Sequence, residues 1–192
     1  MSKLSLDSRL QLFYENGLDL KKRQIIFTSD INQGSMSLLI KNLIILKNAG
    51  KEPINILYSS DGGGWEAGMS AFDVITSIKQ EGIEVNFFCI GLVASMGVVL
   101  LQAASNRFCS PNASFLIHNG SSSINGDTTY KETQSLSKYE QRQTKHMLNL
   151  LGKTKEGGKK LQKLIDKRQE VYFNSEEALQ FNIVDKIITQ IE

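Results

Sequence analysis

The sequence has few of the residues that build metal sites and disulfide frameworks. Two cysteines and two histidines occur among 192 residues, and Cys89 and Cys109 lie in apolar, strand-like segments without a CxxC pair. This distribution disfavours both a zinc site and a disulfide framework. We therefore expect no metal in this chain, and we interpret both cysteines as packing residues.

Long apolar runs and a large excess of one charge are also missing. No segment approaches the ~18 apolar residues of a membrane-spanning helix, and the first residues lack the apolar core of a secretory signal. The formal net charge is +2, far from the basic excess of nucleic-acid-binding domains. We interpret the lysine-rich stretch 153–168 as a solvated helix face. The expectation is a cytoplasmic protein with no nucleic-acid or membrane partner.

Apolar residues follow strand and helix periods in alternation over the first two thirds of the chain. This order predicts an α/β fold in a single domain over residues 1–192, with a mobile N-terminal segment at 1–23. The expected strands cover 24–31, 54–59, 85–92, 107–110 and 114–118, and the expected helices cover 35–50, 65–82 and 95–105.

Beyond His118 the pattern becomes helical. A long helix is predicted over about 127–151 and a second over 157–169, and Asn174 with Glu177 predicts a short capped helix. The chain then ends in a strand-like segment. The long helix has one narrow apolar stripe, which fits packing on its own domain or contact with a partner subunit equally well. The stripe consists of Leu136, Tyr139, Gln143, Met147 and Leu150.

The glycine run "DGGGWEAG" (61–68) lies between a strand and a helix, as phosphate-binding loops do. Gly62, Gly64 and Ala67 fit the form G-x-G-x-x-A, but no acidic residue ends the second strand, as dinucleotide binding requires. No Gly-Lys-Ser/Thr follows either. A glycine run also exposes backbone N–H groups that no side chain shields, and such donors stabilise a developing oxyanion.

Ser95 lies in "GLVASMG" (91–97), where an apolar strand turns into a helix. A nucleophilic hydroxyl needs a base to take its proton, and His118 and His146 are the two histidines of the chain. We interpret His146, in the polar helix, as a surface residue, whereas His118 ends a strand and faces a cleft. The pattern leaves two interpretations of Ser95 open. It is a nucleophile with room for substrate left by Ala94 and Gly97, or this small-residue segment serves close packing.

Several ordered segments resemble the proteolytic subunit of the Clp protease, ClpP. "GLVASMG" is followed by "LIHNG", with His118 placed 23 residues after Ser95, and "SSDGGGWEAGMSAFD" is similar to the glycine-containing segment of that family and its following helix. "RFCSPNASFLIH" and "SEEALQFNIVDKI" resemble two further family stretches. The resemblance extends over about residues 23–188.

The resemblance implies a serine peptidase on the ClpP/crotonase-like fold, with stacked β-sheets flanked by helices and a protruding long-helix handle. Ser95 matches the family's nucleophile and His118 its general base, while Gly63 and Met96 match the residues whose amides form the oxyanion hole. Glu170 stands where the family has an aspartate, and its extra methylene shifts the carboxylate by ~1 Å, a misplacement that lowers rates. Asp166 is the second candidate for the acid.

The resemblance also implies heptameric rings stacked as a tetradecamer, with residues 127–151 as the handle between rings. Peptides, or chains supplied by a hexameric Clp ATPase, would be the substrates. This chain would need no cofactor, since ATP would belong to the partner. The positions matching the family's aromatic docking pocket are Asn55, Leu57 and Ser77, which predicts weak binding of the usual unfoldase.

Three other functions compete with this prediction. A ring subunit with an impaired site would keep the fold and serve a structural role, and the change to Glu170 favours it. A Ser/Lys peptidase of the same fold would not need His118. An acyl-CoA enzyme of the wider crotonase fold would use carboxylates near the oxyanion hole, for which Glu66 is the candidate.

Overall fold

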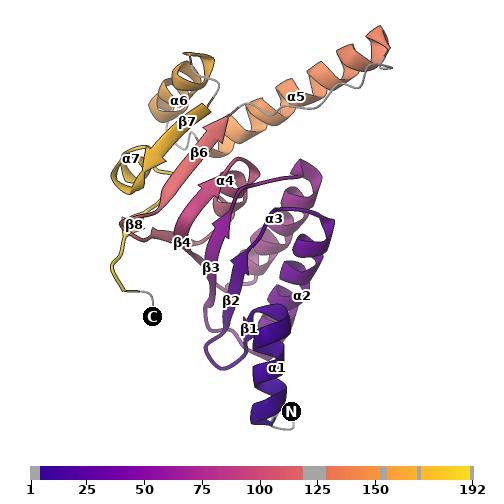
Figure 1. Cartoon of the computed structure of the whole chain (residues 1–192), viewed down its shortest axis with the longest axis vertical. Helices are drawn as coiled ribbons and strands as arrows, with labels where there is room; N and C mark the ends of the chain where they lie inside the picture. The colour runs from indigo at the N-terminus through magenta and orange to yellow at the C-terminus, as the bar shows by residue number, and fades with distance from the viewer. Residues whose placement is uncertain (1–4, 119–128, 152–154, 168–169, 191–192) are drawn as a thin grey trace.

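A mixed sheet forms the centre of the structure (Figure 1). The computed structural model describes residues 5–118, 129–151, 155–167 and 170–190. The strands of this part are β1 (Leu18–Asp19), β2 (Gln24–Thr28), β3 (Ile54–Ser60), β4 (Val85–Ala94), β5 (Asn106–Cys109), β6 (Ser114–His118), β7 (Glu170–Asn174) and β8 (Lys186–Ile187). The helices are α1 (Leu6–Asn16), α2 (Gln33–Ala49), α3 (Trp65–Gln80), α4 (Met96–Leu101), α5 (Tyr130–Leu151), α6 (Lys155–Lys167) and α7 (Ser175–Gln180). The predicted α/β class is confirmed.

The sheet divides at β4. Strands run in the order β1-β2-β3-β4-β5-β8, and β6 joins β4 while β7 joins β6. The first part of β4, Asn86 to Cys89, pairs with β5, and its last three residues, Leu92 to Ala94, pair with β6. The strand layers expected from the sequence are therefore joined into one branched sheet, and the branch starts next to Ser95.

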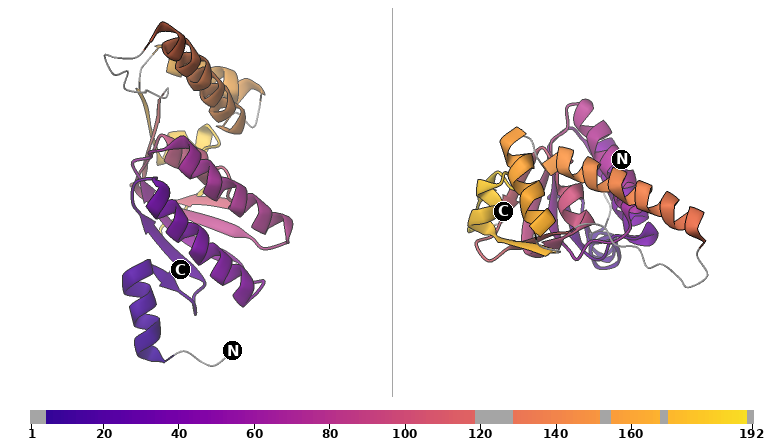
Figure 2. Two further views of the ribbon diagram at one scale, coloured as in Figure 1. Left: turned by 90° about the vertical axis from the view of Figure 1, so that its right-hand side faces the viewer. Right: turned by 90° about the horizontal axis from the view of Figure 1, so that it is seen from above.

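The core lies between the sheet and the helices on one of its faces. Residues of β3 alternate between buried and half-buried, as a strand with one covered face requires. Helices α2 and α3 lie side by side over the covered face (Figure 2). Tyr58 is at the centre of this core, with its ring 5.8 Å from that of Phe27 and 4.9 Å from that of Phe87.

The start of the chain, predicted to be a mobile segment, contains a helix that the sequence analysis did not predict. Residues 6–16 form α1, which Ser5 caps by accepting a hydrogen bond from the Ser8 amide at 3.1 Å. Gly17 ends the helix in a left-handed conformation, φ 63°, and donates to the Phe13 carbonyl. A Ser cap and a Gly stop are ordinary helix signals. No residue of α1 is buried. The helix therefore has no apolar periodicity from which it could be predicted.

Helix α5 protrudes from the sheet as the predicted handle does (Figure 1). It begins at Tyr130 after Thr129, whose amide and hydroxyl donate to the Glu132 carboxylate; positions 127 and 128 lie outside the described residues. Met147 and Leu151 near its end are buried in the protein's own core. The second predicted helix is α6, and the predicted Asn174–Glu177 capping box of α7 is confirmed.

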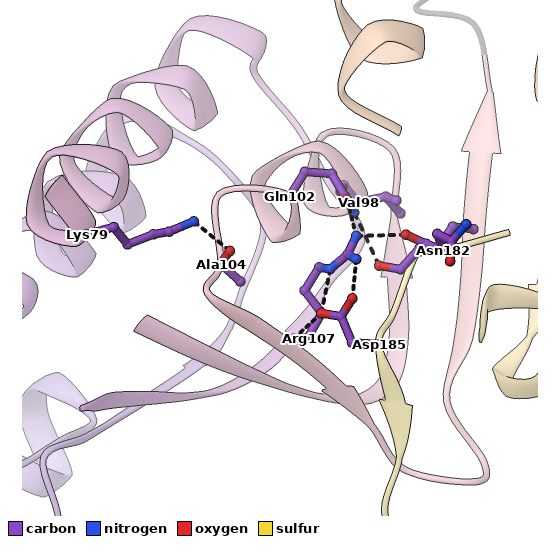
Figure 3. A network of polar contacts seen from close by, with 8 residues as sticks. Lys79, Val98, Gln102, Ala104, Arg107, Asn182 and Asp185 are labelled. Atoms are coloured by element: carbon purple, nitrogen blue, oxygen red, sulfur yellow. Dashed lines mark hydrogen bonds and ion pairs between the residues drawn. The ribbon is translucent and has the colours of Figure 1, made fainter. Parts of the chain in front are cut away.

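Arg107 on β5 ties the C-terminal segment to the core (Figure 3). Its side chain is 3% exposed and forms an ion pair with Asp185. Both carboxylate oxygens of Asp185 accept hydrogen bonds from the guanidinium. The guanidinium also donates to the side-chain oxygen of Gln102 and to the Asn182 carbonyl. A buried guanidinium needs such a set of partners, so residues 182–185 are held against β5.

The chain just after α4 is fixed from two sides. Gln102 donates to the carbonyls of Val98 and Ile183, and the Lys79 ammonium donates to the carbonyls of Ala103 and Ala104 at 2.8 and 2.7 Å. Because α4 has only six residues, anchoring its end also fixes its start. That start is the turn that carries Ser95.

Candidate active site

Ser95 occupies a strained turn between β4 and α4. Its backbone has φ 54° and ψ −125°, a region that non-glycine residues rarely adopt. The turn is held by hydrogen bonds from the Ser95 amide to the Leu116 carbonyl, 2.8 Å, and from the Val98 amide to the Ser95 carbonyl, 3.0 Å. Strained serines at strand-to-helix turns are typical of nucleophile elbows.

The small residues beside Ser95 serve packing rather than substrate access. Ala94 and Gly97 are both buried. Tyr58 donates its hydroxyl to the Gly97 carbonyl at 3.1 Å, and a Cβ on Gly97 would lie 3.3 Å from that hydroxyl. The expectation that Ala94 and Gly97 leave room for substrate is therefore wrong, and the space beside them belongs to the core.

The glycine run is pressed against two neighbouring segments. A Cβ on Gly62 would lie 2.7 Å from the Cβ of Ser95, and one on Gly63 would lie 2.1 Å from the Ile31 carbonyl oxygen. Both residues have positive φ, 94° and 140°. Ile31 donates to the Gly62 carbonyl and accepts from the Gly64 amide. Glycine is thus required here for close approach, and it places this backbone beside Ser95.

One cavity of about 490 Å³ contains the residues at the centre of the prediction. Ser95, His118, Gly63 and Met96 all line it. Both Ser95 and His118 are half-buried. The structure therefore brings these four residues together. Within the described residues, no hydrogen bond joins Ser95 Oγ to the His118 imidazole.

Two residues at this cavity have backbone amides without an acceptor in the part of the chain that the structure describes. Among the described residues, neither the Gly63 amide nor the Met96 amide donates a backbone or side-chain hydrogen bond. Met96 is 3% exposed, and amides in such positions are nearly always paired. Unpaired amides next to a hydroxyl are suited to bind an oxyanion that forms during reaction.

Glu170 lies opposite His118 across the antiparallel β6–β7 pair. Residues in such positions have Cβ atoms about 4.5–5.5 Å apart, so the carboxylate is within reach of the imidazole. One oxygen of Glu170 accepts a hydrogen bond from the Tyr172 hydroxyl at 3.2 Å. Asp166 lies elsewhere, exposed on α6, where it accepts from the Gln162 amide at 2.7 Å. The strand register thus places Glu170, and not Asp166, opposite His118, although no hydrogen bond or ion pair joins the two side chains among the described residues.

Part of the cavity wall was not expected from the sequence. Tyr139 and Gln143 of α5 line it, although the sequence left open whether their stripe faces a partner. Trp65 at the start of α3 also lines the cavity, and its ring lies 5.8 Å from that of the exposed His146. The helical period shows that these side chains share one face, but it does not show what the face meets.

The two cysteines do not compete as nucleophiles. Cys89 and Cys109 are 1% and 0% exposed, which confirms their interpretation as packing residues. Burial raises the pKa of the Cys89 thiol well above its ordinary value and that of Cys109 to about 11. Both thiols therefore stay protonated near neutral pH, and a protonated thiol is a poor nucleophile.

A hydroxyl, an imidazole and free amides around one cavity are the parts that covalent acyl transfer requires. Comparison with known proteins assigns the chain to a family. The family model described as "Clp protease" matches residues 11–191, and the chain belongs to the Clp protease family. Its members are proteases, so this chain is assigned to a family of peptidases.

Named relatives agree with this assignment. The chain is 30% identical over 174 residues to "ATP-dependent Clp protease proteolytic subunit 2" of Chlamydia pneumoniae, covering 88% of this chain and 82% of the relative. It is 29% identical to the protein of the same name from Chlamydia trachomatis serovar D, with the same coverage. Within the described residues, no helix is long and apolar enough to span a membrane.

Proposed function

We propose that this protein is a serine endopeptidase that cleaves peptides or unfolded chains. The observation that carries this proposal is the one cavity that Ser95, His118, Gly63 and Met96 line together. Family membership supports the same chemistry, since the relatives are named as proteolytic subunits. Ser95 is then the nucleophile and His118 the general base.

The reaction follows from these positions. His118 takes the proton of Ser95 Oγ as the oxygen attacks the peptide carbonyl, and the amides of Gly63 and Met96 bind the resulting oxyanion. When the intermediate collapses, the imidazolium returns its proton to the leaving amine. A water molecule then attacks the acyl-enzyme with the same base, which releases the acid product and restores Ser95. Glu170 orients the imidazole and stabilises its positive charge.

Labelling with a fluorophosphonate tests the proposal. This reagent bonds rapidly to activated serines, and peptide mass spectrometry locates the adduct. We expect it on Ser95, with loss of labelling in Ser95→Ala and at least a hundredfold slower labelling in His118→Ala, since replacing even the orienting aspartate of a serine protease triad lowers kcat roughly 10⁴-fold. Undiminished labelling of the Ser95→Ala protein contradicts the proposal.

A ring subunit with an impaired site is the second candidate. The absence of a hydrogen bond between Ser95 and His118 within the described residues favours it, although catalytic hydrogen bonds are often long in free enzymes. An intact protein whose Ser95 reacts no faster than free serine supports the second candidate. For a Ser/Lys peptidase the support is weaker, because no lysine is among the described residues that line the cavity. Retained activity of His118→Ala would revive it.

We also propose assembly into stacked rings, with α5 between them and a hexameric Clp ATPase as the partner that uses ATP. The family and the names of its members support an oligomeric, ATP-dependent protease. Tyr130, 77% exposed on α5, is available for contact with another subunit. Sedimentation of the full chain measures the assembly: a particle near 14 subunits supports the tetradecamer, and a monomer at micromolar concentration contradicts it. We expect the protein in the cytoplasm.

Asn55, one of the positions that match the family's aromatic docking pocket, lies in a row of polar side chains. Asn55 accepts a hydrogen bond from Asn86 at 3.1 Å, and Asn86 accepts one from Asn106 at 2.8 Å, so a row of amides crosses β3, β4 and β5. Amides offer little apolar area for an anchoring side chain. We therefore propose weak docking of a standard Clp ATPase, and tight binding in a titration contradicts this.

A further inference from the structure

The strand pair β6–β7 presents a second residue to the proposed catalytic acid. In its register His118 lies opposite Glu170, and Leu116 lies opposite Tyr172. Side chains two positions apart on a strand lie on the same face, so Glu170 and Tyr172 share the face that His118 occupies. The alternate residues, Val171 and Phe173, are buried on the other face and fix which way the strand points.

Tyr172 makes its one described polar contact with Glu170. The hydroxyl donates to Glu170 Oε2 at 3.2 Å, and the residue is 61% exposed. Its ring therefore contributes little to the core, and its hydroxyl acts on the carboxylate. This hydrogen bond and the nearby negative charge raise the pKa of Tyr172. The hydroxyl consequently keeps its proton over the range in which peptidases are assayed.

A glutamate needs more restraint than an aspartate in this position. Its extra methylene adds a rotatable bond, so the carboxylate samples more positions relative to the imidazole. A donor bound to one oxygen limits these positions and leaves the other oxygen for the His118 ring. Hydrogen bonds to ionised groups are stronger than those between neutral groups, which suits a hydroxyl to this task.

We propose that Tyr172 is a positioning residue that holds the Glu170 carboxylate against His118. This inference rests on the proposed function, because it assigns Tyr172 a role through the catalytic acid. Tyr172 touches neither the substrate nor the reacting atoms. Its hydroxyl compensates for the longer side chain that this protein has in place of the family's aspartate.

A double-mutant cycle tests the inference in the full-length protein. We expect Tyr172→Phe to lower kcat on a short fluorogenic peptide about three- to tenfold, as expected for loss of one hydrogen bond, with KM within twofold of the wild type. The urea unfolding midpoint should not move. In the Glu170→Ala background, Tyr172→Phe should have no further effect on kcat, since coupled residues are not additive. Tyr14→Phe, a change at a tyrosine that is 84% exposed on α1, is the matched control.

Each outcome has a distinct meaning. If Tyr172→Phe keeps wild-type kcat while Glu170→Ala lowers it, the positioning role is overturned and the proposed function stands. An equal loss from Tyr172→Phe in both backgrounds also overturns it, because the hydroxyl then acts elsewhere. If Glu170→Ala matches the wild type, Glu170 is not the acid and the inference falls with it. A wild-type protein that neither cleaves peptides nor labels at Ser95 refutes the proposed function itself.

Discussion

Gly62 offers the most direct test of how the backbone positions the proposed nucleophile. A Cβ at this residue would lie 2.7 Å from both the Ala94 carbonyl oxygen and the Ser95 Cβ, and 3.1 Å from the Met96 amide nitrogen. Ordinary contact begins at 3.4 Å, so the Gly62→Ala protein must separate the glycine run from the Ser95 turn by about 0.7 Å. The Gly63 amide, which is proposed to bind the oxyanion, would then move away from Ser95.

This displacement should lower the rate of peptide hydrolysis. A misplacement near 1 Å lowers the rate of an oriented reaction about 100-fold, so we expect kcat of Gly62→Ala to fall roughly 10- to 100-fold. The φ of 94° adds strain for any residue with a side chain, about 1–2 kcal/mol of unfolding free energy. Peptide hydrolysis and urea unfolding of the same preparation separate the two effects.

Gly82 provides the matched control. It also has a positive φ, 82°, but a Cβ there would meet nothing within 4 Å. Gly82→Ala should therefore lose a similar amount of stability and keep wild-type kcat. If folded Gly62→Ala hydrolyses peptides within twofold of the wild-type rate, close approach of Gly62 to Ser95 does not position the nucleophile, and this reasoning is refuted.

Three further predictions concern stability and thiol chemistry. Asp185→Ala leaves the buried Arg107 without its carboxylate, so urea unfolding should show a loss of about 3 kcal/mol; a loss below 0.5 kcal/mol contradicts the anchoring role. Asn174→Ala removes the α7 cap and should lower the unfolding free energy by about 1 kcal/mol, whereas Asn174→Ser should restore most of it. Because burial raises the pKa of Cys109 to about 11 from an ordinary 9.0, the thiol stabilises the folded state below pH 9, and this contribution is lost as pH rises toward 11. Ellman's reagent at pH 8 should modify neither Cys109 nor Cys89 until the protein unfolds, and rapid reaction of the folded protein contradicts their burial.

Capping residues and apolar periodicity predicted the helices and strands whose formation depends on neighbouring residues in the sequence. The capped start of α7 follows from Asn174 and Glu177 alone, because both hydrogen bonds of a capping box form within four residues. The central strands follow from their apolar pattern. Leu38 and Leu39 show the limit of periodicity: both are apolar residues of α2, yet Leu38 is 36% exposed and Leu39 is 1% exposed. The helical period does not distinguish the two edges of a broad apolar face.

Strand β7 shows a signal that was present but weak. "EVYFN" alternates in burial, with Val171 and Phe173 inside, and this period of two predicts a strand. Five residues between two helices are too few to separate the pattern from a connecting loop. Nor does the pattern indicate the partner strand, so the position of Tyr172 beside Glu170 required the register of β6–β7.

The site itself depends on how strands far apart in the chain come together. Parallel pairing of β4 with β6 places Ala94 beside Leu116, so Ser95, the next residue, lies near the end of β6 that carries His118. Antiparallel pairing of β6 with β7 then adds Glu170 opposite His118. The proposed nucleophile, base and acid are thus brought together by three neighbouring strands, with Ser95 directly after β4, although 23 and 52 residues of chain separate them. Spacing along the sequence carries no information on this register, because a shift of one residue would turn His118 to the opposite face. What keeps the register is the buried face of the same strands, where Phe115, Ile117, Val171 and Phe173 pack. The geometry of the proposed site is therefore maintained by apolar residues on the opposite, buried face of the strands.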